Sequence, residues 1–372
     1  MNVVGLTQEL VRYNTINPPG DERDCARHLG RVLEKSGFAV AEYEFSERRT
    51  SLVARIGGTS GRPPLCFTGH IDTVPLGTAR WRQDPFAGDI DGGKLYGRGT
   101  TDMKSGVAAF VVAASRLAPR LAGTPGLVLV ITASEETACE GARHLATLPA
   151  ALGEAGAIVV AEPTGNAPCV GHKGALWIEV RTTGVTAHGS MPERGVNAVV
   201  KAARAVLKLE AFRFDVPAHP ILGPPTLNVG TFHGGLNVNS VPDSAVIGVD
   251  IRTILDQKHA ALLDRLTAEL RDDASVHTVS GAESLWTDPD HPWIRETFEI
   301  AERIAGIPSA VRAAPYFTDA SALTPAYGGA PTIILGPGEM QLAHQTDEYC
   351  LVERCEQAVE IYLELITRWC GV

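Results

Sequence analysis

The order of apolar and polar residues changes twice along the chain, and the first 173 residues alternate short apolar runs with amphipathic stretches. Apolar runs of about five to seven residues are typical of strands that are buried on both faces. We predict strands at Pro64–Gly69, Gly126–Thr132 and Ala157–Ala161, and helices at Cys25–Ser36, Ser105–Leu117 and Glu140–Thr147. Strands and helices that alternate in this way indicate an α/β sheet covered by helices on both faces.

The pattern changes after Gly174, where several segments alternate apolar and polar residues as half-buried strands do. We predict strands at Ala175–Thr183, Thr226–Phe232, Ala245–Thr253 and Ser275–Val279, and helices at Val196–Leu209 and Gln257–Leu270. The resulting order, β-α-β-β-α-β, is that of a ferredoxin-like α+β unit.

The α/β pattern returns after Pro289. We predict a helix at Trp293–Ile304, a strand at Pro331–Leu335 and a final helix at Val352–Trp369. A chain of 372 residues is long enough for two domains. We therefore predict a discontinuous catalytic domain, 1–173 plus 290–372, and an inserted α+β domain, 174–289.

Composition and charge exclude several classes of protein. Hydrophobic residues make up 44% of the chain and the formal net charge is −10, whereas disordered chains have fewer apolar residues and more charge per residue. An acidic chain without basic runs argues against nucleic-acid binding. The apolar runs are shorter than the roughly 20 residues of a membrane-spanning helix, and the first residues lack a signal-peptide pattern. We expect a cytoplasmic protein that binds neither nucleic acid nor membranes.

Residues able to bind a metal follow four of the predicted strands. They are His70 after the first strand, Glu135 and Glu136 after the second, Glu162 after the third, and His344 in the segment after the fourth. Ligands gather at the carboxyl ends of the strands in an open α/β sheet, so we expect these side chains to lie together. Asp102, in the glycine-rich loop 97–102, is a further candidate for the same edge.

Each of these residues has a simpler interpretation when taken alone. A histidine after a strand is more often a hydrogen-bonded core residue, and Glu135 and Glu136 could be stabilised by the dipole of the next helix. Glu162 could be a solvated loop acid. The simpler interpretations are less convincing for the whole set than for each residue alone, because several separate strand ends carry only histidine or carboxylate.

The residue types suit a pair of metal ions. The seven cysteines are scattered and form no C-x-x-C pair, so we expect reduced thiols and metal ligands drawn from imidazoles and carboxylates. Two imidazoles and three carboxylates suit two zinc-like ions about 3.5–4 Å apart that share one carboxylate. One of the adjacent residues Glu135 and Glu136 would then remain free to act as a general base.

Four motifs, taken in chain order, resemble a known family. They are Gly69–Pro75 (GHIDTVP), the Gly97–Gly106 loop, Ser134–Thr137 (SEET) and Ala161–Thr164 (AEPT). The chain resembles, over essentially its whole length, the dinuclear-zinc deacylases and peptidases that include acetylornithine deacetylase, succinyl-diaminopimelate desuccinylase, aminoacylase and carboxypeptidase G. Residues 172–174, 335–338 and 343–349 are most similar to the acetylornithine deacetylase branch.

The resemblance implies a zinc-peptidase-like catalytic domain with a mixed sheet, and an inserted ferredoxin-like domain through which two chains form a homodimer. His70 and Glu162 would hold one zinc ion, Glu136 and His344 would hold the other, and Asp102 would bridge them. Similar ligands also accept cobalt or manganese.

Further catalytic roles follow from the same resemblance. Glu135 would be the general base and acid, and Asp72 would accept the second N–H group of His70 and so fix its orientation. His188 would reach the site of the partner subunit and stabilise the oxyanion.

Four residues are candidates for substrate binding. Arg252 and Asn239 match substrate-binding positions of the family, and Thr318 and Gly338 would shape the pocket. A guanidinium suits bidentate binding of an α-carboxylate. Alternatively, Arg252 could form a surface ion pair and Asn239 could stabilise a turn.

The resemblance favours an N-acyl-L-amino acid as substrate, with N2-acetyl-L-ornithine first, and therefore a role in arginine biosynthesis. The tripeptide Thr318-Asp319-Ala320 stands where that enzyme commonly has Thr-Glu-Ala, so the substrate side chain stays open. Within the family, the alternatives are a dipeptidase, a carboxypeptidase or a desuccinylase. A non-catalytic, metal-containing scaffold is the alternative from another class, and the presence of Glu135 beside all five ligands argues against it.

Overall fold

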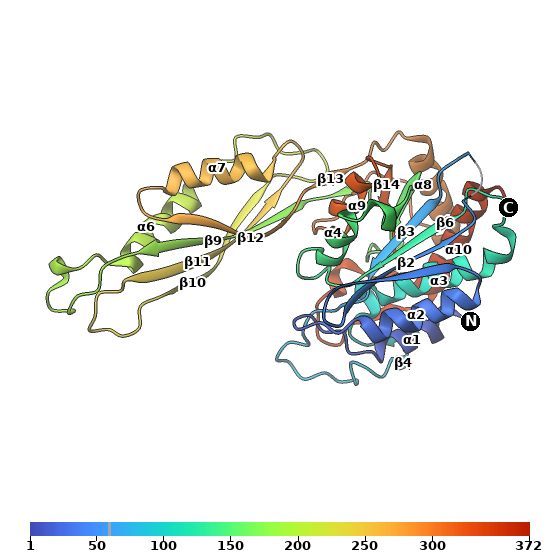
Figure 1. Cartoon of the computed structure of the whole chain (residues 1–372), viewed down its shortest axis with the longest axis horizontal. Helices are drawn as coiled ribbons and strands as arrows, with labels where there is room; N and C mark the ends of the chain where they lie inside the picture. The colour runs from blue at the N-terminus through green and yellow to red at the C-terminus, as the bar shows by residue number, and fades with distance from the viewer. Residues whose placement is uncertain (59–60) are drawn as a thin grey trace. The chain divides into compact units, whose positions relative to one another are not determined.

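The computed structural model describes residues 1–58 and 61–372, which form two compact units (Figure 1). The first unit contains Met1–Gly171, Trp286–Ala314 and Thr318–Val372, and the second contains His172–Leu285 and Pro315–Phe317. Strands β8 (Gly171–His172) and β13 (Leu285–Trp286) lie where the chain passes from one unit to the other.

A six-stranded mixed sheet forms the centre of the first unit, with the strand order β1-β2-β6-β3-β7-β14. The strands are β1 (Ala39–Ser46), β2 (Arg49–Ile56), β3 (Leu65–His70), β6 (Leu127–Thr132), β7 (Ala157–Val160) and β14 (Thr332–Ile334). Strands β6, β3, β7 and β14 run parallel, whereas β1 and β2 add an antiparallel hairpin at one side. Every residue of the four parallel strands is buried, which explains their mostly apolar sequences.

Helices cover both faces of this sheet (Figure 1). They are α1 (Val3–Val11), α2 (Arg23–Lys35), α3 (Ser105–Leu117), α4 (Glu140–Ala146), α5 (Pro149–Leu152), α8 (Pro292–Ala305), α9 (Ala320–Ala326) and α10 (Val352–Cys370). Helix α3 packs against α1 and α10, and α4 packs against α9. None of the described helices is long and apolar enough to cross a membrane.

Helix α3 approaches the end of β7 closely at Gly106, which has no side chain. A Cβ atom added at Gly106 would lie 2.1 Å from the carbonyl oxygen of Ala161. The ring of Phe67 on β3 packs against the rings of both Phe110 on α3 and Tyr362 on α10. This packing fixes the ends of β3 and β7 relative to the loop that precedes α3. A small three-stranded sheet with the order β15-β5-β4 contains β4 (Ile90–Asp91) and β5 (Lys94–Tyr96), which precede that loop, and β15 (Tyr349–Leu351), which precedes α10.

The second unit is an antiparallel sheet with the order β10-β11-β9-β12 and two helices. Its elements are β9 (Gly174–Thr183), α6 (Ala198–Ala211), β10 (Thr226–Gly234), β11 (Ser244–Thr253), α7 (His259–Leu270) and β12 (Ser275–Ala282). Apolar residues of both helices and of β9 and β11 form its core. The predicted β-α-β-β-α-β order is confirmed. The last strand is longer than predicted, because it continues past Val279 to Ala282.

Candidate metal centre and active site

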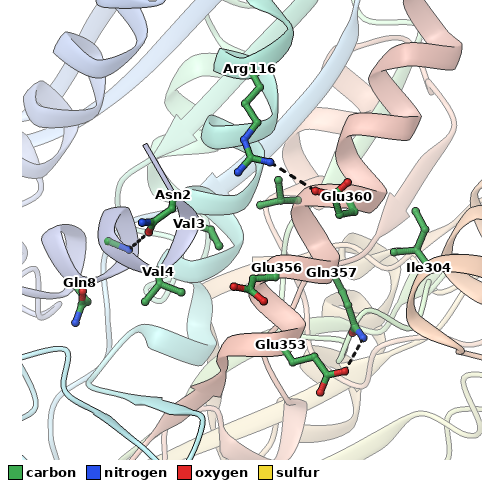
Figure 2. A pocket seen from close by; sticks show the side chains of 12 residues that line it. Asn2, Val3, Val4, Gln8, Arg116, Ile304, Glu353, Glu356, Gln357 and Glu360 are labelled. Atoms are coloured by element: carbon green, nitrogen blue, oxygen red, sulfur yellow. Dashed lines mark hydrogen bonds and ion pairs between the residues drawn. The ribbon is translucent and has the colours of Figure 1, made fainter.

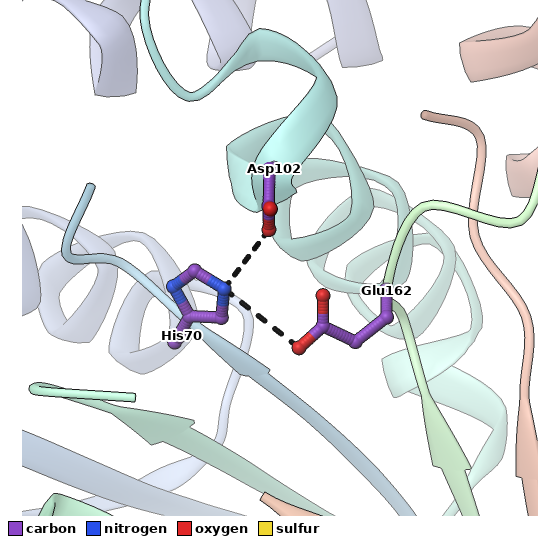
Figure 3. A group of neighbouring side chains, drawn as sticks. All are labelled: His70, Asp102 and Glu162. Carbon is purple, nitrogen blue, oxygen red and sulfur yellow. Dashed lines mark hydrogen bonds and ion pairs between the residues drawn. The ribbon is translucent and has the colours of Figure 1, made fainter. Parts of the chain in front are cut away.

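Three of the predicted ligands meet beyond the carboxyl ends of β3 and β7. His70 is the last residue of β3, Glu162 follows β7, and Asp102 lies in the loop before α3. The Nε2 atom of His70 lies 3.2 Å from Asp102 Oδ1 and 3.7 Å from Glu162 Oε1. Figure 3 shows the two carboxylates directed at the same ring nitrogen. Potential ligand atoms of all three residues lie within 4.8 Å of one another.

A second group of three ligands shares Asp102 with the first. The Nε2 atom of His344 lies 3.4 Å from Asp102 Oδ2 and 3.1 Å from Glu136 Oε2. Asp102 therefore directs one carboxylate oxygen to His70 and the other to His344. The structure thus brings together the five predicted ligands in two groups joined by one carboxylate, which is the arrangement expected for a pair of ions.

The two groups fit divalent metal ions. Each combines an imidazole with two carboxylates, which is a donor set that zinc and similar ions accept. The Oε1 atom of Glu136 is buried and has no hydrogen-bond partner among the described residues. Burial raises the pKa of Glu162 well above its usual range, and the nearby carboxylates of Asp102 and Glu136 raise it further. Carboxylates gathered out of water in this way call for a cation between them.

Asp72 connects His70 to the segment that carries the two glutamates. The Nδ1 atom of His70 lies 3.0 Å from the main-chain oxygen of Asp72 and 3.4 Å from its Oδ1 atom. The Asp72 carboxylate accepts the backbone N–H groups of Glu135 at 3.0 Å and Glu136 at 3.2 Å. The side chain of Asn17, which the sequence did not single out, donates to Asp72 Oδ2 at 2.9 Å. Asp72 thus holds the His70 ring and the Glu135–Glu136 backbone in one hydrogen-bonded unit.

Glu135 lies beside the metal groups but in neither of them. Its side chain is buried, and burial raises its pKa well above the usual range for a glutamate, while His70 opposes that rise. The Sγ atom of Cys139 lies 3.7 Å from its Oε1 atom. A buried carboxylic group that lies next to two groups of potential metal ligands, and belongs to neither, is suited to exchange a proton.

Thr318 and Gly338, the two predicted substrate-binding residues of the first unit, make close contacts with the backbone of neighbouring residues. Thr318 is fully buried, and its hydroxyl oxygen accepts the N–H group of Ala320 at the start of α9, at 3.2 Å. Gly338 lies against the loop of Asp102, since an added Cβ atom would be 2.1 Å from the carbonyl oxygen of Thr101. The neighbouring Asp319 is buried, which raises its pKa to about 6. Substrate binding by Thr318 and Gly338 stays a prediction.

The other three predicted residues belong to the second unit. His188 is exposed, and its Nδ1 atom lies 2.8 Å from the hydroxyl oxygen of Ser190. Asn239 is also exposed, and its main-chain oxygen accepts the N–H group of Gly189 at 2.7 Å, next to His188. Arg252 forms an ion pair with Asp250 on the same strand, at 3.0 Å. Their roles toward substrate stay predictions.

A groove elsewhere in the first unit lies apart from the candidate metal ligands. It has a volume of about 750 Å³ and lies between α1, α3 and α10 (Figure 2). Glu353, Glu356 and Glu360 of α10 line it, and Arg116 pairs with Glu360 at 3.6 Å. It shares no lining residue with the metal groups, so cavity size does not locate the candidate active site.

Comparison with known proteins places these features in one family. Residues 66–368 match the family model described as Peptidase family M20/M25/M40. An acetylornithine deacetylase from Proteus mirabilis is 32% identical over 363 residues, which cover 92% of this chain and 89% of the relative. A probable succinyl-diaminopimelate desuccinylase from Staphylococcus epidermidis is 30% identical, with 97% of this chain and 96% of the relative covered.

Solved structures show the same fold at lower sequence identity. An M20 family metallo-carboxypeptidase from Sulfolobus solfataricus superposes with a TM-score of 0.83 at 16% identity, over 100% of both chains. A dinuclear metal binding peptidase of the M20 family from Bacillus subtilis superposes with a TM-score of 0.70 at 16% identity, over 99% of this chain and 98% of that one. Both likenesses extend over the mixed sheet and the separate antiparallel sheet.

Proposed function

The chain belongs to peptidase family M20/M25/M40 and is a metallohydrolase of that family, and we propose that it hydrolyses the amide bond of an N-acyl-L-amino acid. The observation that carries the proposal is the pair of ligand groups joined by Asp102, with Glu135 beside them. N2-acetyl-L-ornithine or a close analogue is the first candidate substrate, because the acetylornithine deacetylase of Proteus mirabilis is similar over nearly the whole chain. That substrate would give the enzyme a role in arginine biosynthesis.

Two divalent metal ions are part of the proposal, with zinc as the first choice and cobalt or manganese as alternatives. His70 and Glu162 would hold one ion, Glu136 and His344 the other, and Asp102 would contribute one oxygen to each. Bound together, the ions would lower the pKa of a water molecule and polarise the acyl carbonyl group.

Glu135 would move the proton in this reaction. Its carboxylate takes a proton from the attacking water, whose oxygen forms a bond to the acyl carbon. The C–N bond then breaks, and Glu135 returns the proton to the departing amine nitrogen. The buried position of Glu135 suits the first step, because burial raises its pKa and so makes its carboxylate a stronger proton acceptor. Asp72 supports both steps by holding the backbone N–H group of Glu135.

The second unit would complete the site in a homodimer. Leu236 and Val238, which follow β10, are completely exposed at 100% and 104% of their reference areas. Exposed large apolar residues of this kind mark interaction surfaces. His188 would stabilise the oxyanion in the partner's site, and Arg252, with Asn239, would bind the substrate carboxylate. The purified protein should sediment as a dimer, and a monomer with full activity would contradict this part of the proposal.

The test of the reaction is acetate release from a panel of N-acetyl-L-amino acids by chelator-treated protein, before and after zinc or cobalt is returned. We expect activity only with metal, and the highest activity on N2-acetyl-L-ornithine. Metal-dependent activity on another member of the panel would keep the reaction and replace the substrate. Preference for N-succinyl compounds or dipeptides would favour a desuccinylase or a peptidase, and two bound ions without any amide hydrolysis would favour a scaffold.

Glu135→Gln tests the mechanism separately. The variant should bind both ions and lose activity by about 100-fold to 10,000-fold, the usual contribution of a general acid–base residue. Glu154→Gln, the same change at an exposed glutamate of the first unit, is the control and should retain full activity. Near-normal turnover by Glu135→Gln would exclude this glutamate as the proton carrier.

A further inference from the structure

The loop that carries Asp102 is connected to the segment that carries His344 by a buried carboxylate. Glu348 is fully buried, and its Oε1 atom accepts the backbone N–H groups of Gly99 at 3.0 Å, Thr101 at 2.8 Å and Asp102 at 3.1 Å. One oxygen of this side chain therefore accepts three backbone N–H groups from four consecutive residues of the loop. The last of the three N–H groups belongs to the residue that is shared by both ligand groups.

The second oxygen of Glu348 is bound by a buried arginine. The Nη1 atom of Arg98 lies 2.5 Å from Glu348 Oε2, and the Arg98 side chain is only 2% exposed. The same guanidinium donates to the main-chain oxygens of Gln345 at 3.3 Å and Pro75 at 3.1 Å. Gln345 follows His344 directly, and Pro75 lies three residues after Asp72. Arg98 thus joins the Asp102 loop to two further segments that carry candidate residues of the site.

These contacts connect the segment of Asp102 with the segment of His344. Asp102 Oδ2 and His344 Nε2 are 3.4 Å apart, and both belong to loops rather than to the sheet. The His344 side chain is 51% exposed, so little packing fixes it from outside. An ion pair buried between the two loops is therefore the structure best placed to hold this distance constant.

We propose that Glu348, together with Arg98, is a positioning residue of the metal centre, and that it fixes the spacing between Asp102 and His344. The proposal rests on the proposed metal-dependent function. Glu348 touches neither substrate nor metal in this scheme. It acts through the backbone of Asp102 and through the segment from His344 to Glu348.

The proposal can be tested because other contacts keep the two loops together. The N–H group of Gly97 donates to the main-chain oxygen of Glu348 at 3.0 Å, and the hydroxyl of Thr101 donates to the main-chain oxygen of Tyr349 at 2.8 Å. A substitution of the Glu348 side chain leaves both of these contacts in place. Glu348→Gln keeps the side-chain shape and one carbonyl oxygen, but it places an amide N–H₂ group against the Arg98 guanidinium, or against three backbone donors.

The experiment is a titration of chelator-treated protein with cobalt. Calorimetry measures the affinity of each ion, and visible absorption reports the coordination of the bound ion. The wild type should bind two ions. In Glu348→Gln the ion held by Glu136 and His344 should bind about tenfold to hundredfold more weakly, with a changed absorption band, which is the usual effect of removing a residue that orients ligands. The ion held by His70 and Glu162 should also weaken, through Asp102, but less, because only the other ion depends in addition on the segment that carries His344. The two affinities should therefore separate.

Asp347→Asn is the matched control. It makes the same change of acid to amide one residue away, and it removes an ion pair with Arg82, whose side chain is 88% exposed. Both cobalt affinities and the absorption spectrum should stay as in the wild type. If Glu348→Gln fails to fold, Arg98→Lys decides in its place, because lysine keeps the charge and loses the planar fork that reaches Gln345 and Pro75.

The outcomes are distinct. A folded Glu348→Gln, or Arg98→Lys where that variant decides, with both wild-type affinities and the wild-type spectrum would overturn the positioning role. Equal weakening by Asp347→Asn would also overturn it, because the effect would then belong to the loop and not to the buried pair. A wild-type protein that binds fewer than two ions would instead refute the proposed metal centre itself.

Discussion

Replacing His172 with glutamine should remove a loss of stability that the protein suffers in mild acid. The His172 side chain is fully buried, and its Nδ1 atom donates to the main-chain oxygen of Lys173 at 2.9 Å. A carbonyl oxygen can only accept, so the proton of the neutral ring is on Nδ1 and the buried Nε2 atom carries a lone pair without a hydrogen-bond partner among the described residues. Protonation would place a charge and an unpaired N–H group at that point.

The structure gives the size of the effect. Burial lowers the pKa of His172 from 6.5 to about 4 in the folded protein, although the hydrogen bond to Lys173 opposes this. The unfolded chain therefore takes up the proton first as the pH falls, and the folded state loses stability from about pH 6.5 down to about pH 4. At 1.36 kcal/mol for each pH unit, the loss between pH 7.5 and pH 5 is about 2 kcal/mol.

The assay is urea unfolding of metal-free wild type and His172→Gln at both pH values. The metal-binding residues titrate alike in the two proteins, so the difference between the two pH dependences belongs to His172. The free energy of unfolding of the wild type should fall by about 2 kcal/mol more than that of the variant. In a ¹³C spectrum of labelled histidines, the signal that the variant lacks should not titrate near pH 6.5. A signal that titrates there, or equal pH dependences, would refute the reasoning.

Two further predictions concern packing near the candidate site. Gly338→Ala would place a Cβ atom 2.1 Å from the carbonyl oxygen of Thr101, so it should cost about 1–3 kcal/mol and lower the melting temperature, whereas Gly61→Ala, with no atom within 4 Å of the added Cβ, should be neutral. Tyr362→Phe removes the hydroxyl that donates to the buried main-chain oxygen of Leu335 at 2.5 Å, and should cost about 1–3 kcal/mol in urea unfolding. Unchanged stability of either variant would show that the backbone relaxes around the site.

The helices and strands that could be predicted are those whose pattern of residues reflects a single factor, the burial of apolar side chains. The buried parallel strands are mostly apolar, and the predicted bounds of α3, Ser105–Leu117, match the observed ones because its apolar residues are all buried. The hairpin of β1 and β2 was not predicted. Strand β1 is an exposed edge strand with glutamates along it, and the turn contains Arg48 at a φ of 62° rather than the usual glycine.

The candidate ligands could be located because chain topology alone brings strand ends together. His70 ends one of two neighbouring parallel strands and Glu162 follows the other, so their proximity required no knowledge of side-chain packing. The residues that hold them could not be found in this way. Asn17 donates to Asp72 across 55 positions of sequence, and Arg98 pairs with Glu348 across 250. Nothing local distinguishes such residues from a loop amide or a surface ion pair, because their role depends on burial after folding.

The shared carboxylate explains why so many close contacts surround one loop. Asp102 directs Oδ1 to His70 and Oδ2 to His344, so a shift of its backbone would change both ligand groups at once. A shift of exposed His344 would change only one. A site built on a bridging carboxylate therefore has to be most rigid at the bridge. The contacts follow this rule, because the buried carboxylate of Glu348 and the glycine at position 338 both lie directly against the backbone of the Asp102 loop.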